Sequence, residues 1–309
     1  MKKLVVYSLS LALSITVIAQ TPIKIDTASA TVHGPENGSL LIIGGNVGNT
    51  PAIWNKFVEL AGGKEKARIV VISAATGDSA AYRNDEVEQI KKYTGIKTVT
   101  LLHATSITEA NSDGFVAPLK QATGVYLLGG RQWRIADYYL NTLTHQAFNE
   151  LLRRGGVIAG SSAGASIQGS FLWRGDTHNA RILVGDHTQG LGFLKNSIID
   201  QHLLRRNRQF DLVDAVKQAP QLIGLGLDEA TAVVVQRDIL EVIGKSYVAV
   251  YDYNTITGKG RQHVTGDKED YTASSGPFFF LGENQKYDLR KREVIKTIPV
   301  RGAATSGGQ

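Results

Sequence analysis

Short apolar runs alternate with longer amphipathic stretches through the first half of the chain. The apolar runs are rich in β-branched residues and leucine, as buried strands are, and the amphipathic stretches have the pattern of helices. We predict strands at Leu40–Ile43, Ile69–Ile72, Thr98–Leu102, Val125–Leu128 and Val157–Ala159. We predict helices at Pro51–Ala61, Asn84–Tyr93, Asp113–Gln121 and Thr144–Arg153. Strict alternation implies right-handed crossovers, so the pattern predicts an α/β fold, a three-layer sandwich with a mostly parallel central sheet.

The second half keeps this alternation at first and then changes. Ser197–Asp200 and Leu222–Leu227 are predicted strands, with a helix over Asn207–Ala219 between them. Closely spaced apolar runs then predict C-terminal antiparallel strands that end the sheet as a meander. These runs are Thr231–Gln236, Ile239–Ile243 and Tyr247–Tyr251, and Phe278–Leu281 predicts a last edge strand.

The N-terminus has the pattern of a secretory signal peptide. Two lysines precede Leu4–Ala19, an apolar stretch with scattered serines. Cleavage after Ala19 or after Ala30 would leave small residues at the usual positions, and both sites stay open. The apolar core of roughly 16 residues is short for a membrane span of about 20. We therefore expect a secreted protein, extracellular or periplasmic, without stable membrane insertion.

These patterns divide the chain into three parts. Residues 1–30 are the expected signal peptide and leader, residues 38–300 a single α/β domain, and the small, polar residues 302–309 a disordered tail. A chain of 309 residues can bury a full core, which matters because it has no cysteine and hence no disulfide. The net charge falls from +6 to +4 once Lys2 and Lys3 are removed. With no stripe of arginine and lysine among aromatic residues, nucleic acid is not an expected partner.

The segment Gly160-Ser161-Ser162-Ala163-Gly164 follows the last strand of the first half directly. A strand that runs into Gly-x-Ser-x-Gly predicts a nucleophile elbow, in which small residues allow a sharp turn that exposes the central serine. Ser162 is therefore the candidate nucleophile. Ser161 and Ser166 are alternatives, but only Ser162 has a glycine two residues away on each side.

A serine nucleophile needs a base and a carboxylate that orients the base. Among seven histidines, His202 fits best because it directly follows the strand ending at Asp200. The carboxyl ends of neighbouring parallel strands open on one edge of a sheet, where Ser162 is also expected. Asp228 and Glu229 follow the next strand, and either could orient His202.

Backbone N–H groups near the elbow are candidates for an oxyanion hole. The residue after the nucleophile, Ala163, normally supplies one of them. Gly129 and Gly130 follow a predicted strand, and the loop that they begin can supply the second, because glycine lets a backbone approach a substrate closely. Gln132 is placed to donate a hydrogen bond to substrate.

Three arginines, Arg205, Arg206 and Arg208, lie at the start of a predicted helix, where the dipole disfavours cations. Binding of a carboxylate-bearing substrate explains this placement better than stability does. A metal site is the rival interpretation of another cluster, Asp176, His178, Asp186 and His187. Its spacing matches no zinc motif, and we predict neither a metal nor a cofactor.

Four motifs occur in order: Gly-Gly-x-Gln at 129–132, the elbow at 160–165, Asp-Gln-His at 200–202 followed by two arginines, and Gly-Leu-Gly-Leu-Asp-Glu at 224–229. Together they resemble the cyanophycinase branch of the peptidase family that also contains aspartyl dipeptidase (peptidase E). The resemblance implies a fold like that of class I glutamine amidotransferases and a serine–histidine–glutamate triad. It places the triad on Ser162, His202 and Glu229. It places substrate binding on Gln132, Asp200, Gln201, Arg206 and Arg208.

The resemblance leads us to expect a serine exopeptidase that hydrolyses β-aspartyl linkages in cyanophycin, an aspartate backbone bearing arginine, and releases β-Asp-Arg dipeptides. Its partner would be a peptide or polymer containing aspartate and arginine, and a homodimer is compatible with the chain. An aspartyl or isoaspartyl dipeptidase and a non-catalytic amidotransferase-like binding protein are the alternatives. Two residues depart from the family pattern: Asp211 replaces a further arginine, and Arg131 replaces a small polar residue. Both change the charge near the expected pocket.

Overall fold

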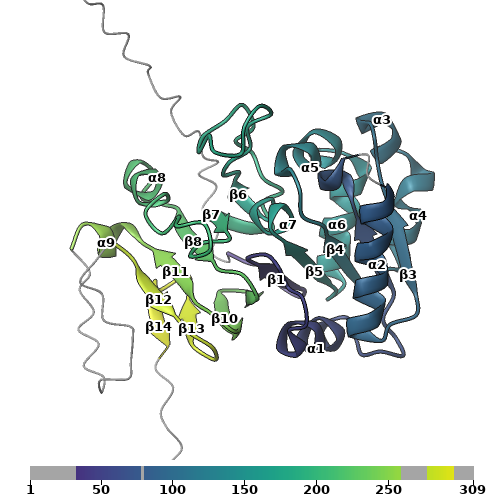
Figure 1. Cartoon of the computed structure of the whole chain (residues 1–309), viewed down its shortest axis with the longest axis horizontal. Coiled ribbons are helices and arrows are strands. Elements are labelled where there is room, and N and C mark those ends of the chain that lie inside the picture. The colour runs from purple at the N-terminus through teal and green to yellow at the C-terminus, as the bar shows by residue number, and fades with distance from the viewer. Residues whose placement is uncertain (1–32, 78–79, 259–276, 296–309) are drawn as a thin grey trace, which may run out of the picture.

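The computed structural model describes residues 33–77, 80–258 and 277–295, and Figure 1 shows their arrangement. Two sheets lie side by side, with helices around the first of them. The expected leader at residues 1–30 and the expected tail at residues 302–309 lie outside the described residues. Among the helices of the described part, none is long and apolar enough to span a membrane.

The larger sheet has nine strands in the order β14-β13-β10-β9-β1-β5-β4-β2-β3. The half from β1 to β3 is parallel, as the alternating pattern predicted. Its strands are β1 (Ser39–Ile43), β2 (Ile69–Ile72), β3 (Val99–Leu102), β4 (Gly124–Leu127) and β5 (Val157–Ser161). The other half pairs antiparallel, beginning with β9 on β1. Its strands are β9 (Thr231–Gln236), β10 (Ile239–Gly244), β13 (Lys286–Asp288) and β14 (Glu293–Ile295).

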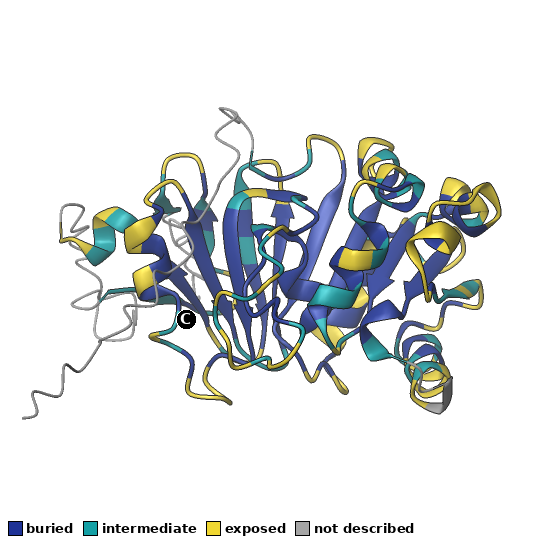
Figure 2. Ribbon diagram, turned by 90° about the horizontal axis from the view of Figure 1, so that it is seen from above, coloured by how far each residue is buried: buried dark blue, intermediate teal, exposed yellow. Residues whose placement is uncertain are grey.

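Both faces of the parallel half are covered by helices, because its strands are apolar on both sides. Leu40 and Ile42 of β1 pack into one core cluster, and Leu41 and Ile43 pack into another. The first face carries α4 (Asp113–Gln121), α5 (Gln132–Tyr139), α6 (Leu143–Arg153) and α7 (Ala163–Ser166), and the second carries α1 (Pro51–Leu60) and α2 (Ala80–Thr94). Figure 2 shows buried strands between helices whose outer surfaces are exposed. Short helical segments lie at η1 (Ala74–Thr76), α3 (Ile107–Ala110) and α9 (Tyr253–Ile256).

A second sheet of five strands corrects the prediction of one sheet that ends in a meander. Its order is β12-β11-β8-β7-β6, from β6 (Gly169–Phe171), β7 (Leu194–Gln201), β8 (Ile223–Leu227), β11 (Val248–Tyr251) and β12 (Phe279–Leu281). The strands β9 and β10 do form a hairpin, but β11 leaves it and pairs with β8 instead. Leu225 and Leu227 of β8 join the core of the larger sheet, so the two sheets share one interior.

The helix predicted over Asn207–Ala219 is shorter than expected. Helix α8 spans only Val213–Gln218, and residues 202–212 form a series of turns. Asn207 has a positive φ of 56°, which interrupts any helix begun earlier. The three arginines therefore lie in turns and not at a helix N-terminus, and the predicted anion site at such a terminus is wrong.

Candidate active site

Ser162 lies at a sharp turn between β5 and α7. Its φ of 57° and ψ of −112° are a strained combination for a residue with a side chain, as a nucleophile elbow requires. The turn depends on the flanking glycines, since a Cβ on Gly160 would lie 2.1 Å from the Gly164 carbonyl oxygen. The two alternative serines have other surroundings. The Ser161 hydroxyl interacts with Tyr126, and the buried Ser166 hydroxyl has no hydrogen-bond partner among the described residues.

The structure brings Ser162, His202 and Glu229 into one hydrogen-bonded row. His202 Nε2 lies 2.9 Å from Ser162 Oγ, and His202 Nδ1 lies 2.7 Å from Glu229 Oε1. With the proton on Nδ1, the imidazole donates to the carboxylate and accepts from the serine hydroxyl, which is the arrangement of a general base. Asp228, the other acid considered from the sequence, turns away and accepts from Leu204 N, Arg205 N and Ser246 Oγ.

The charges around this row favour a neutral histidine beside a charged glutamate. Burial is the largest influence on His202 and lowers its pKa; the hydrogen bond to Glu229 opposes this, and Arg206 lowers the pKa further. Burial on its own raises the pKa of Glu229, but hydrogen bonds from Asn46 and His202 outweigh it, so the pKa lies below its usual value. A neutral imidazole can accept the serine proton near neutral pH.

The candidate oxyanion donors lie next to the nucleophile. A Cβ on Gly129 would lie 3.4 Å from Ser162 Cβ, so the Gly-Gly loop directly borders the elbow. Gly130 has a φ of 135°, and a Cβ there would lie 2.0 Å from the Ala75 carbonyl oxygen, which explains why glycine is needed. Among the described residues, the N–H groups of Gly130 and Ala163 make no hydrogen bond. Both remain able to donate to a substrate oxygen.

Asp200 lies beneath the site as the centre of a buried ion cluster. Its side chain is fully buried and accepts from Trp173 Nε1 at 3.2 Å, Arg174 Nε at 3.0 Å and Arg208 Nη1 at 3.2 Å. These partners come from the loop after β6 and from the turns after β7, so Asp200 joins these two segments. A direct contact of Asp200 with substrate remains a prediction.

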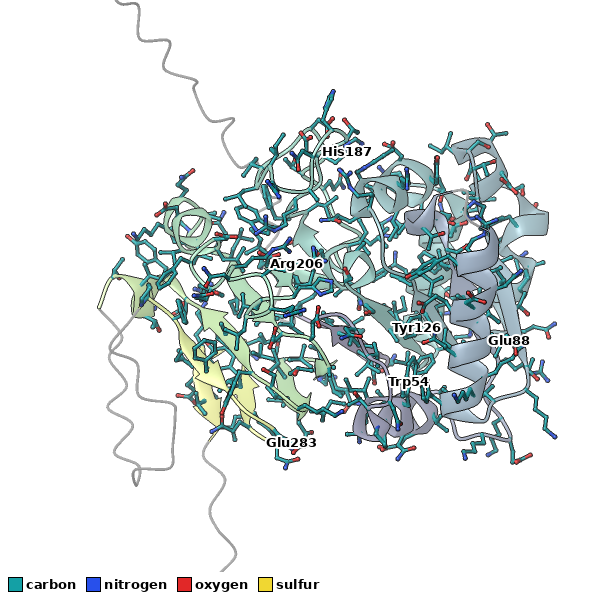
Figure 3. All side chains as sticks on the ribbon, in the orientation of Figure 1. Trp54, Glu88, Tyr126, His187, Arg206 and Glu283 are labelled. Atoms are coloured by element: carbon teal, nitrogen blue, oxygen red, sulfur yellow. The ribbon has the colours of Figure 1, made fainter. Side chains whose placement is uncertain are left out.

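The other predicted substrate-binding residues differ in how far they are buried. Gln132 is buried, and its Nε2 donates to the Trp173 carbonyl at 2.8 Å. Gln201 is also buried, and its Oε1 lies 3.3 Å from Arg208 Nη1. Arg206 is exposed, and its backbone N–H donates to the His202 carbonyl at 2.9 Å. Figure 3 labels Arg206 near the centre of the molecule. Of this set, Arg206 is therefore the one exposed cation beside the triad, and its role remains a prediction.

The two departures from the family pattern both form contacts with the loop after β6. Arg131 Nη2 donates to the Asp176 carbonyl at 2.5 Å. Asp211 forms an ion pair with Arg174, which also binds Asp200. Sequence reasoning missed Arg174 because its partners are distant in the chain. Its position, in a loop between two motifs, gave no periodic or spacing signal.

The four residues considered as a metal site lie close together in the loop after β6. Ligand atoms of Asp176, His178 and Asp186 lie within 4.8 Å of one another. Asp176 Oδ1 accepts from two backbone N–H groups, and Asp186 accepts from Thr177, so both carboxylates act as acceptors within the loop. His187 contacts two carboxylates: its Nδ1 lies 2.9 Å from Asp186 Oδ1, and its Nε2 lies 2.6 Å from Oδ1 of Asp137 in α5.

In this layered α/β fold, a serine at a strained strand–helix turn is hydrogen-bonded to a histidine, and the histidine is hydrogen-bonded to a glutamate. This is the arrangement of a serine hydrolase. The model of Peptidase family S51 matches residues 40–243, a range that contains the whole row. The chain therefore belongs to peptidase family S51. The resemblance inferred from the four motifs is confirmed, and so is the assignment to a family of serine-type peptidases.

Named relatives agree with this assignment. The chain is 32% identical to a cyanophycinase of Trichormus variabilis over 188 residues, 59% of this chain and 62% of that protein. It is 30% identical to a cyanophycinase of Geminocystis herdmanii over 185 residues, 58% of this chain and 67% of that protein. The chain thus spans less than two thirds of the Trichormus protein.

A solved structure supports the fold. The crystal structure of a peptidase from an acI-B1 Actinobacterium superposes with a TM-score of 0.59 and 22% identity, covering 83% of this chain and 98% of that one. The expected α/β fold with a mostly parallel central sheet, like that of class I glutamine amidotransferases, is confirmed.

Proposed function

We propose that this protein is an exported serine exopeptidase that cleaves β-aspartyl linkages in cyanophycin and releases β-Asp-Arg dipeptides. The observation that carries the proposal is the row Ser162–His202–Glu229, found in a chain similar to cyanophycinases. Export rests on the sequence of residues 1–19. A polymer too large to enter a cell is a coherent substrate for a secreted enzyme.

The reaction follows from the positions of the three side chains. Ser162 Oγ attacks the substrate carbonyl carbon while His202 Nε2 takes the hydroxyl proton. Glu229 holds the imidazole in the tautomer that can accept this proton and stabilises the imidazolium that forms. The oxyanion is bound by the N–H groups of Gly130 and Ala163, which have no partner among the described residues. His202 then gives the proton to the leaving amine, and water hydrolyses the acyl-enzyme by the same route.

Recognition of an acidic backbone requires a cation that is free to bind it. The guanidinium of Arg208 already pairs with Asp200, whereas Arg206 is exposed beside His202. Arg206 is therefore the residue that we assign to a substrate carboxylate. The charge of Arg206 also lowers the pKa of His202 and so favours the neutral imidazole.

Incubation with insoluble cyanophycin tests the proposal. We expect the parent protein to clear the suspension and release β-Asp-Arg, and Ser162→Ala to leave the polymer intact. Ser166→Ala is a matched control, because it removes a serine hydroxyl from the same turn-and-helix segment without touching the row. It should clear the suspension at the parental rate.

The alternatives give different outcomes. Cleavage of short aspartyl peptides without clearing would overturn the polymer assignment and favour a dipeptidase. Absence of hydrolysis with either substrate, together with equal ligand binding by the parent and Ser162→Ala, would favour a binding protein. Detection of the full N-terminus on the purified native protein, with none in the medium or the periplasm, would contradict export.

A further inference from the structure

The turn that follows β1 contacts all three residues of the row. Ser162 N donates to the Ile43 carbonyl at 3.0 Å, and His202 N donates to the Gly44 carbonyl at 2.8 Å. The residue after Glu229, Ala230, donates from its N–H to the Gly45 carbonyl at 2.9 Å. Three segments distant in sequence thus take their positions from three successive carbonyl groups.

Gly45 brings this turn against the imidazole itself. A Cβ on Gly45 would lie 2.2 Å from His202 Cε1 and 2.6 Å from Nδ1. The φ of Gly45 is 136°, a conformation that residues with a side chain rarely adopt. The His202 ring therefore lies flat against the backbone of the turn, which limits its rotation toward that side.

Asn46, the next residue, reaches the carboxylate. Its Nδ2 donates to Glu229 Oε2 at 3.0 Å, while Glu229 Oε1 lies 2.7 Å from His202 Nδ1. Each carboxylate oxygen therefore has its own partner. The Glu229 side chain is 22% exposed, so without Asn46 water would bind Oε2 and the carboxylate could rotate.

We propose that Asn46 is a positioning residue of the active site, which holds Glu229 charged and oriented toward His202. Asn46 does not touch the reacting atoms, and it acts through Glu229. The inference rests on the proposed catalytic role of the row. The hydrogen bond favours the charged carboxylate, and the charged carboxylate in turn keeps the imidazole proton on Nδ1.

A purely conformational role is the competing explanation. Asn46 has a φ of 41°, and asparagine tolerates this left-handed conformation better than most residues. Asn46→Gly separates the two roles, because glycine accepts the same φ and lacks the amide. Asn284→Gly is a matched control: Asn284 is exposed, has a φ of 67° and lies in a β-turn region away from the row.

The readout is the rate at which a fluorophosphonate labels Ser162, measured against pH. This reaction needs the row but no particular substrate, so a wrong choice of substrate in the proposed function would not affect it. For Asn46→Gly we expect labelling about tenfold slower, the loss typical of one hydrogen bond to a charged group, with thermal stability equal to that of Asn284→Gly.

A second variant tests whether the side chain at position 46 faces the Glu229 carboxylate. Asn46→Asp keeps the size and the φ preference but places a carboxylate against Glu229. The added negative charge raises the pKa of His202, so the acid limb of the labelling profile moves to higher pH. If Asn46→Gly labels as fast as Asn284→Gly, or if Asn46→Asp leaves the acid limb in place, the positioning role is wrong.

Discussion

Two histidines of this molecule each bind carboxylates, yet their surroundings shift their pKa values in opposite directions. His202 has one carboxylate, Glu229, on Nδ1 and a serine hydroxyl on Nε2, and its side chain is 10% exposed. His187 has a carboxylate on each nitrogen, Asp186 and Asp137, and is 24% exposed. Burial lowers the pKa of both, but the two carboxylates raise that of His187 above its ordinary value, whereas His202 stays below.

The difference shows what a general base requires and what a structural histidine does not. A base must lose its proton near neutral pH and must have one nitrogen free to accept, which a second carboxylate would prevent. His187 instead joins the loop after β6 to α5, and its ring centroid lies 6.1 Å from that of Trp133. Figure 3 labels His187 in the loop region, apart from Arg206 near the row.

The largest expected difference in activity is between the same substitution made at His202 and at His187. His202→Gln removes the base, and we expect hydrolysis to fall by about 10⁶-fold. His187→Gln leaves the row intact, so turnover should stay within about threefold of the parent. Steady-state hydrolysis of the proposed substrate measures both. A comparable loss in the two variants would mean that His187 also takes part in the chemistry.

The next largest difference in activity is expected between substitutions of the carboxylates that bind the two histidines. Glu229→Gln offers an amide that can donate to Nδ1 and so favours the wrong tautomer of His202; we expect kcat to fall by about 10⁴-fold with KM little changed. Asp137→Asn is the matched control at His187, and kcat should stay near the parental value. Full activity in Glu229→Gln would exclude Glu229 from the triad.

The pH dependence of activity should follow His202. Below its pKa the imidazole is protonated and cannot accept the Ser162 proton, so the rate falls as pH falls through this value. Because the pKa is below its ordinary 6.5, the acid limb should lie below pH 6.5. Arg206→Gln removes a charge that lowers this pKa, and the limb should then move to higher pH. Fluorophosphonate labelling across pH measures both; an unmoved limb would exclude the influence of Arg206.

The smallest effect concerns stability. A raised pKa means that His187 binds its proton more tightly in the folded state, so its contribution is full below pH 6.5 and is lost as pH rises through the folded pKa. Because the ion pairs of His187 are partly exposed, we expect them to contribute at most about 1 kcal/mol to the free energy of unfolding. Thermal unfolding of the parent and of His187→Gln should therefore differ at pH 6 and converge at high pH. A difference that grows with pH would contradict a raised pKa of His187.

Local patterns in the sequence were enough to predict most of the framework. β2 (Ile69–Ile72) and α4 (Asp113–Gln121) have the predicted bounds, because apolar runs and amphipathic stretches report burial directly. The elbow was visible because Gly160 and Gly164 are required by local sterics. The division into two sheets was not, since β11 has the same apolar pattern whichever neighbour it pairs with.

The candidate site, too, could be predicted only where local patterns in the sequence mark it. Ser162, His202 and Glu229 each follow a strand, and strand ends are visible in a sequence. Asn46 and Arg174 were missed because their importance comes from partners 183 and 26 residues away, Glu229 and Asp200 respectively. The glycines at 44 and 45 were noticeable at a strand end, and the polar residue directly after them was the available signal for Asn46.

The row is shared between the two sheets: Ser162 follows β5 of the larger one, whereas His202 and Glu229 follow β7 and β8 of the smaller one. The rate of turnover therefore depends closely on the position of one sheet relative to the other. A shift of about 1 Å between them would break the 2.9 Å contact of Ser162 with His202 and leave every strand hydrogen-bonded. In a urea titration, we expect hydrolysis to disappear before the far-ultraviolet circular dichroism changes.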